Sequence, residues 1–132
     1  MDVDSGDIEA TTTVGESPWC LCPHPTRPRL FVTCRRGQQL LALDSVSLAT
    51  LRRIDLPGDP PGVAVSEDGQ RVYVALHSLD QLAVLDAETG KEIKRLATGN
   101  GPQSVRVAAG TGRVYVTNLL SNPTPPDQPC RN

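Results

Sequence analysis

Apolar residues are concentrated in short runs separated by turn-forming residues, most clearly between positions 61 and 97. Two of these runs, Val72-Tyr73-Val74-Ala75 and Leu82-Ala83-Val84-Leu85, are apolar at consecutive positions, which is typical of strands covered on both faces. The following run carries charged side chains, as expected of a strand at an exposed sheet edge. The pattern predicts four strands, at residues 61–66, 71–76, 81–86 and 92–97.

Turn-forming residues stand between these predicted strands. Asp68-Gly69 can supply the positive φ of a tight hairpin, and Asp86 with Thr89-Gly90 fits an Asx-type turn. A Gly-Asn-Gly-Pro sequence at residues 99–102 links this unit to the next one. Because each connection is short, we expect neighbouring strands to be antiparallel.

The whole unit repeats along the chain with an offset of 42 residues. An arginine, an aliphatic residue, an aromatic residue and a valine recur in order, as Arg29-Leu30-Phe31-Val32, Arg71-Val72-Tyr73-Val74 and Arg113-Val114-Tyr115-Val116. A proline leads each copy, at Pro18, Pro60 and Pro102. Four antiparallel strands buried on both faces, with this period, are what a β-propeller blade requires. The sequence therefore predicts an all-β fold, a partial β-propeller of about two and a half four-stranded blades.

The repeat also sets the predicted boundaries of a partial propeller over residues 1–118. Shifted by 84 positions, residues 8–15 match the last strand of a blade. Residues 16–58 form blade 1, residues 59–100 form blade 2, and residues 101–118 form half of blade 3. The remainder, residues 119–132, has four prolines between positions 123 and 129, and we expect a disordered tail there.

Fewer than three complete blades do not close a ring, since closed propellers typically have about four to eight. Three explanations are open: a truncated gene product, an assembly in which copies join to complete a ring, or a small open solenoid. We favour truncation, with self-association second, because the repeat pattern stops abruptly after Asn118.

Tyr115-Val116-Thr117-Asn118 spells the signature of one known repeat type. The chain resembles the YVTN family of seven-bladed β-propeller repeats over roughly residues 8–118, and the second copy carries most of the shared positions, including Pro60, Asp68-Gly69 and Thr89-Gly90. The resemblance implies the repeat but no single activity. Family members include surface-layer and periplasmic proteins, lactonase-like enzymes and relatives of redox-enzyme subunits.

Composition narrows the range of partners. A net charge of −2 and a pI near 5.6 give no clustered cationic surface for nucleic acid. The acidic N-terminal residues do not form a secretory signal, so a cytoplasmic location is the default expectation. The longest apolar runs are much shorter than the roughly 20 residues that span a bilayer. We expect no nucleic-acid partner and no membrane span.

The sequence has no recognisable catalytic or cofactor-binding motif, neither a phosphate-binding loop nor a nucleophile elbow nor a metalloprotease motif. We therefore predict no cofactor and favour a protein that is not an enzyme. The best candidates for ligand contact lie in or beside the loop between the second and third strands, which in propellers shares a face with the inter-blade link; they are Arg35, His77, Asp80 and Asn118. His77, Ser78 and Asp80 resemble a catalytic triad in residue type only.

Three cysteines and a histidine cluster near the start of blade 1, at Cys20, Cys22, His24 and Cys34. Inert buried thiols are the favoured interpretation, because free cysteine packs as a small apolar residue. If Cys20 faces Cys34 across the first hairpin, a disulfide is possible, and the four residues together could bind zinc. The spacing is not that of a standard zinc module, so no metal is predicted.

Three functions are consistent with these observations. The first is a non-catalytic repeat scaffold that binds a protein or a small ligand through loops on one face. The second is a remnant of a lactonase-like hydrolase or another propeller enzyme, inactive alone because such sites draw residues from several blades. The third is a fragment without an independent function.

Overall fold

The computed structural model describes residues 1–119, which form three antiparallel sheets. Blade 1 consists of β1 (Pro18–Pro23), β2 (Arg29–Cys34), β3 (Gln39–Asp44) and β4 (Thr50–Asp55). Blade 2 consists of β5 (Val63–Val65), β6 (Arg71–Leu76), β7 (Gln81–Asp86) and β8 (Glu92–Ala97), with a 3₁₀ turn, η1 (His77–Leu79), after β6. Blade 3 contains β9 (Pro102–Val107) and β10 (Val114–Asn118). The predicted all-β fold is confirmed.

Strand pairing repeats with the same offset as the sequence. Arg29 of β2 lies opposite Asp44 of β3, and Arg71 of β6 lies opposite Asp86 of β7. Even the irregularities repeat, since the register shifts between Ala42 and Leu43 in blade 1 and between Val84 and Leu85 in blade 2. The 42-residue unit found in the sequence is therefore a structural unit.

The predicted Asx turn follows the third strand of both complete blades. The Oδ1 atom of Asp44 accepts hydrogen bonds from the backbone amides of Val46 and Ser47, at 2.9 and 2.8 Å. In blade 2 the Oδ1 atom of Asp86 accepts the equivalent bonds from two amides, at 2.9 and 2.8 Å. These amides stabilise the carboxylate and lower the pKa of both aspartates. Gly90, at φ 75°, completes the turn in a left-handed conformation that glycine adopts without strain.

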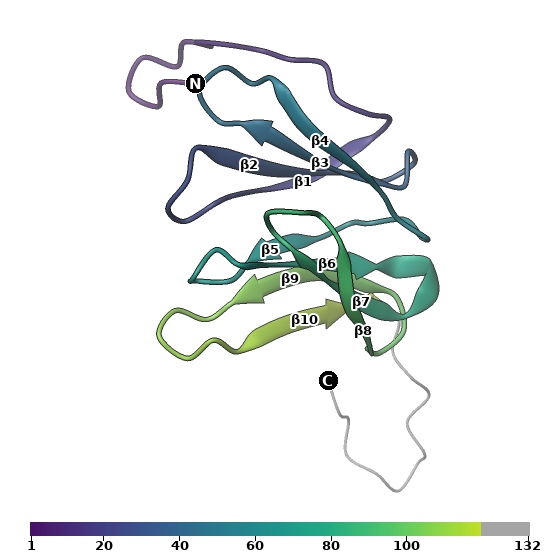
Figure 1. Cartoon of the computed structure of the whole chain (residues 1–132). Coiled ribbons are helices and arrows are strands. Elements are labelled where there is room, and N and C mark those ends of the chain that lie inside the picture. The colour runs from purple at the N-terminus through teal and green to yellow at the C-terminus, as the bar shows by residue number, and fades with distance from the viewer. Residues whose placement is uncertain (120–132) are drawn as a thin grey trace, which may run out of the picture.

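The three blades stack face to face, with blade 2 between the other two (Figure 1). Phe31 and Leu40 of blade 1 are buried against Val63, Val74 and Leu76 of blade 2 in the largest apolar cluster. Side chains alternate between the two faces of a strand, so Val32, Leu41 and Leu43 point to the other face of blade 1. Both faces of the central strands are buried, which explains their consecutive apolar residues.

The contact between blades 2 and 3 is smaller. Its buried members are Ala64, Ala75 and Leu82 of blade 2 and Val105 of blade 3. The side chains of Tyr73, Val107, Val114 and Val116 are partly buried around them. Only two strands of blade 3 lie within residues 1–119, and this interface is correspondingly short.

Residues 8–15 were expected to form an outer strand, but the structure has no strand there. A fourth strand needs the free edge of a third strand, and blade 3 has only two strands within residues 1–119 and lies at the far end of the stack. The N-terminal residues instead run along the outer face of blade 1 (Figure 1), where Val14 packs against the apolar cluster of Val32, Cys34, Leu41 and Leu43.

The repeat register nevertheless holds at the end of this segment. Gly15 lies against the Cys34 side chain, and Gly99, 84 positions later, lies against the Asn118 side chain. The first strand of blade 2, Val63–Val65, is shorter than expected. Just before it, Gly62 approaches the backbone of β9, where a Cβ atom would come within 2.6 Å of the Gln103 carbonyl oxygen. The predicted proline-rich tail lies outside the described residues except for Leu119.

Candidate functional site

The turns after β2 and β6 and the links between blades lie on the same edge of the stack. The Arg35 amide donates to the Ser17 carbonyl oxygen at 2.8 Å, and the His77 amide donates to the Asp59 carbonyl oxygen at 3.0 Å. The Leu119 amide repeats this bond to the Gly101 carbonyl oxygen at 2.7 Å. We call this edge the loop face; it comprises residues 15–17, 35–38, 56–60, 77–80 and 98–101.

Asp59, in the link between blades 1 and 2, organises the centre of the loop face. Its Oδ2 atom accepts a hydrogen bond from Arg35 Nε at 3.0 Å, and its Oδ1 atom accepts one from the Ser78 amide at 3.0 Å. Burial by itself raises the pKa of Asp59, but hydrogen bonds from Ser78 and Arg35 outweigh it and leave the pKa below its usual value. Asp59 is thus an ionised carboxylate that joins Arg35 of blade 1 to the turn of blade 2.

The Arg35 guanidinium also lies over the Trp19 indole, with Cζ 5.0 Å from the ring centroid. This distance is within the range of a cation–π interaction. Arg35 is only about a quarter exposed, although it stands in a surface turn. The ion pair and the aromatic ring together fix the orientation of this guanidinium.

A surface hollow of about 400 Å³ opens beside this arginine. Its size is within the range of small-molecule sites, about 300–1,000 Å³. We call it the Trp19–Arg35 hollow; its lining residues are Ser17, Trp19, Arg35, Arg36, Gln38 and Asp59. Of the four ligand-contact candidates predicted from the sequence, only Arg35 lines it.

The other three candidates lie elsewhere on or beside the loop face. The Asp80 carboxylate accepts a hydrogen bond from the Gly101 amide at 2.8 Å, and the His77 ring packs against the same glycine. Asn118, at the end of β10, fills the space beside Gly99. Within residues 1–119 the His77 Nδ1 atom is buried without a hydrogen-bond partner. His77, Ser78 and Asp80 therefore do not form a proton relay in this structure.

Trp19 and Asp59 were missed by sequence reasoning. Both stand at positions where the repeat varies, since Asp59 corresponds to Ser17 and Gly101 in the other copies. The available signal for Asp59 was a charged residue at a position that carries a small residue in both other copies. Trp19 is the only tryptophan of the chain, but its proximity to Arg35 depends on the pairing of β1 with β2.

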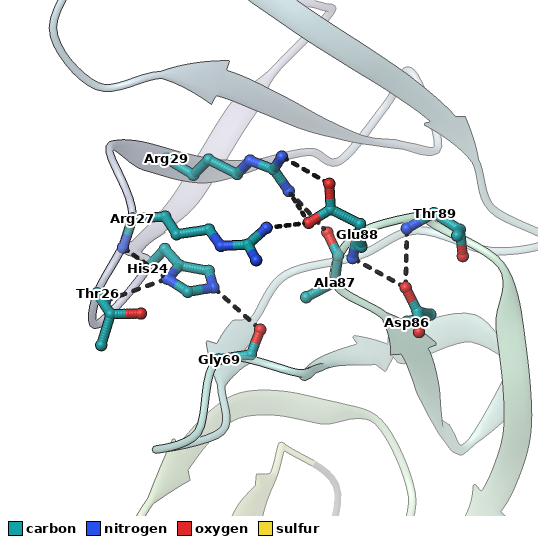
Figure 2. A network of polar contacts seen from close by, with 9 residues as sticks. All are labelled: His24, Thr26, Arg27, Arg29, Gly69, Asp86, Ala87, Glu88 and Thr89. Carbon is teal, nitrogen blue, oxygen red and sulfur yellow. Dashed lines mark hydrogen bonds and ion pairs between the residues drawn. The ribbon is translucent and has the colours of Figure 1, made fainter.

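The opposite edge of the stack carries a second polar network (Figure 2), centred on His24 of blade 1. The His24 Nδ1 atom accepts hydrogen bonds from the Thr26 and Arg27 amides at 3.1 and 3.0 Å, so it is unprotonated. The Nε2–H group donates to the Gly69 carbonyl oxygen of blade 2 at 2.9 Å. His24 is therefore a structural contact between the two blades.

Two arginines of blade 1 meet Glu88 of blade 2 beside this histidine (Figure 2). Arg29 pairs with the carboxylate through both of its η nitrogens, each at 3.0 Å from a Glu88 oxygen, and Arg27 pairs with the same group. The Glu88 side chain is more than half exposed. Both arginines pair with this one carboxylate, and the network therefore joins the two blades.

The cysteines do not gather as the alternative hypotheses required. Cys20 lies opposite Thr33 and Cys22 lies opposite Phe31, so both face blade 2. Cys34 belongs to the cluster on the other face of blade 1. Burial raises the pKa of the Cys22 and Cys34 thiols. The register therefore excludes a Cys20–Cys34 disulfide and a site using all four residues, and residues 1–119 contain no group of three metal-binding side chains.

No protein-family model matches the chain, and no curated protein matches it either. Several solved structures, however, are similar to this chain. Hydrazine synthase of Kuenenia stuttgartiensis is 23% identical, with a TM-score of 0.73 over 86% of this chain and 33% of that chain. The WD40 repeats of RRP9 are 16% identical, with a TM-score of 0.72 over 80% of this chain and 34% of that chain.

The β-propeller domain of Cps50 (Swd1) from Myceliophteria thermophila is 11% identical, with a TM-score of 0.64 over 74% of this chain and 31% of that chain. The chain spans about a third of the length of each of these structures. No helix within residues 1–119 has the length and apolar character needed to cross a membrane. At these identities the comparisons establish the fold, and the fold of this chain is that of a partial β-propeller.

Proposed function

We propose that this chain is a non-catalytic β-propeller scaffold, built from YVTN-type repeats, that binds a protein or a small ligand through its loop face. The observation that carries this proposal is the Trp19–Arg35 hollow, where an aromatic ring and an ionised aspartate hold a guanidinium in one orientation. Preorganised polar groups beside an apolar wall are typical of ligand sites. The YVTN-type repeat is supported by Tyr115-Val116-Thr117-Asn118, which occupies β10.

The loop face is better suited to binding than to hydrolysis. Asp59 has a lowered pKa and its oxygens are engaged by Arg35 and Ser78, so it is a weak base. Asp80 is bound to the Gly101 amide and does not orient His77. Within residues 1–119 the loop face thus lacks a base paired with a nucleophile, as a lactonase-like reaction would require.

Chemical-shift mapping tests where ligands bind. The ¹⁵N-labelled chain would be titrated with a mixed set of anionic, neutral and cationic aromatic fragments. We expect concentrated shifts at the Trp19 indole, Arg35 and Ser78, with Thr26 and Glu88 on the opposite edge as internal controls. Shifts confined to the opposite edge, or none on the loop face, would contradict the proposal.

A second assay addresses catalysis. The purified chain would be incubated with γ-butyrolactone, and ring opening would be followed by proton release. We expect the rate of the buffer blank. Hydrolysis above that rate that disappears in a His77→Ala variant would overturn the non-catalytic assignment and favour the lactonase-like alternative.

A further inference from the structure

We propose that the Trp19–Arg35 hollow binds a carboxylate group, held by Arg35 and Arg36 against the Trp19 indole. This inference rests on the proposed function, because it names the ligand class of the same face. It follows from the unused donors of Arg35, from the charge balance of the hollow and from the flat aromatic wall.

The Arg35 guanidinium is held in place, but only some of its hydrogen-bond donors have a partner. Its Nε atom donates to Asp59 and its Cζ atom lies over the Trp19 ring. Its two η nitrogens make no hydrogen bond within residues 1–119. A planar guanidinium offers pairs of parallel donors that match the two oxygens of a carboxylate. The remaining donors of Arg35 are therefore fixed in orientation before a ligand arrives.

The charge of the hollow favours an anion. Arg35 and Arg36 are both lining residues, whereas Asp59 is the single carboxylate that lines it. The lowered pKa of Asp59 means that it is already ionised at neutral pH, and one arginine compensates its charge. Arg36 has no ion-pair partner within residues 1–119 and leaves the hollow with a net positive charge. The whole chain carries −2, so this positive charge is local.

The Trp19 indole distinguishes the hollow from a purely ionic site. Trp19 is 59% exposed, so the ring offers a flat apolar surface next to the guanidinium. A planar carboxylate attached to a small apolar group can pair with Arg35 while that group contacts the indole. On the opposite edge, Arg29 already uses both of its η nitrogens on Glu88 and Arg27 uses one, so neither arginine keeps both η nitrogens for a ligand.

Fluorescence titration provides a direct readout, because Trp19 is the only tryptophan in the chain. The probes are benzoate, its neutral isostere benzamide, and inorganic phosphate, at constant ionic strength. A blocked glutamyl tripeptide, added as a fourth probe, tells whether a peptide side chain binds like a free acid. We expect benzoate to change Trp19 emission and to bind at least about tenfold more tightly than benzamide.

Charge-matched variants assign the contact to individual arginines. Arg35→Gln is expected to weaken benzoate binding by about tenfold or more, and Arg36→Gln by a few-fold, because an ionic hydrogen bond is lost in each. Arg113→Gln removes the same charge from exposed Arg113 in blade 3 and should leave affinity unchanged. Arg35→Lys keeps the charge but removes the planar fork, and should weaken binding nearly as much as Arg35→Gln.

The experiments distinguish failure of the carboxylate assignment from failure of the proposed loop-face binding. If neutral fragments bind the loop face as tightly as benzoate, or if phosphate binds more tightly, loop-face binding stands and the carboxylate assignment is wrong. If no fragment shifts loop-face residues, both are wrong. Thermal unfolding of each variant shows whether the fold is intact. If the Arg35 variants unfold, the Arg36→Gln variant decides the question. Equal benzoate affinity in Arg36→Gln and Arg113→Gln would then overturn the carboxylate assignment.

Discussion

The two interfaces between blades are built from the same repeat but differ greatly in extent. Between blades 1 and 2, the buried cluster includes Phe31, Leu40, Val74, Leu76 and other residues of both complete sheets. Between blades 2 and 3 it is reduced to Ala64, Ala75, Leu82 and Val105, with a few partly buried neighbours. The repeat therefore specifies where blades touch, and the number of strands on each side determines how much apolar surface is buried.

Polar contacts reinforce the same difference. The first interface has the His24–Gly69 bond, the Glu88 network on one edge and the Arg35–Asp59 pair on the other. The second has two bonds from blade-3 amides to blade-2 carboxylates, Gly110 to Glu67 at 2.6 Å and Gly101 to Asp80 at 2.8 Å. We expect blades 1 and 2 to form the stable part of the chain and blade 3 to open first.

The largest expected difference in stability between the two interfaces is at the repeat position of Phe31 and Tyr115. Phe31 and Tyr115 are equivalent by an offset of 84, but Phe31 is 1% exposed and Tyr115 is 57% exposed. Phe31→Ala should reduce the free energy of unfolding by about 3–5 kcal/mol, because it leaves a cavity in the first interface. Tyr115→Ala should cost less than about 1 kcal/mol. Urea unfolding measures both, and equal losses would contradict the comparison.

A glycine pair tests the contact at His24. Gly69 and Gly110 both have positive φ, at 72° and 76°, but a Cβ on Gly69 would lie 2.3 Å from the His24 ring, whereas Gly110 has open space. Gly110→Ala should cost about 1–2 kcal/mol for the left-handed backbone alone. Gly69→Ala should cost clearly more, because the ring must also move. Thermal unfolding of both variants gives the difference; a difference near zero would mean that His24 moves freely.

The Arg35–Asp59 pair predicts a smaller, pH-dependent effect. Because the pKa of Asp59 is lowered in the folded chain, the unfolded chain binds more protons in acid, and stability rises with pH through that window. The contribution is complete above the ordinary aspartate pKa of about 3.9 and is lost as the pH falls through the folded value. Asp59→Asn should therefore flatten the stability profile below about pH 4. Identical acid slopes for both proteins, measured by urea unfolding, would refute this role.

The Glu88 network should contribute least. Glu88 pairs with Arg27 and Arg29 but is more than half exposed, so Glu88→Gln should lower the midpoint of thermal unfolding only slightly. Salt should reduce that effect, because exposed ion pairs are screened. Thermal unfolding at low and high salt measures it, with Glu92→Gln, which disrupts the local pair with Arg95 in β8, as a control that does not join two blades. A salt-independent loss would indicate packing instead of charge.

The strands of blade 2 show how much of the fold could be read from the sequence. Residues 71–76, 81–86 and 92–97 form strands with the predicted bounds, because local hydrophobic patterning and turn residues set them. Residues 8–15 occupy the register of a fourth strand in the repeat, but strand formation also requires a partner edge. Residues 1–119 offer them no such edge, and they lie on the outer face of blade 1 instead.

The candidate site likewise has one part that the sequence determined and another that only the tertiary structure determined. The sequence alone determined the 42-residue period, the order of strands and the position of Arg35 in a turn between two of them. Only the tertiary structure decided that this turn meets Trp19 from β1 and Asp59 from the next link, since these three residues are not periodic and are brought together by strand pairing and blade stacking. Backbone hydrogen bonding repeats with the sequence, whereas the meeting of individual side chains depends on long-range packing.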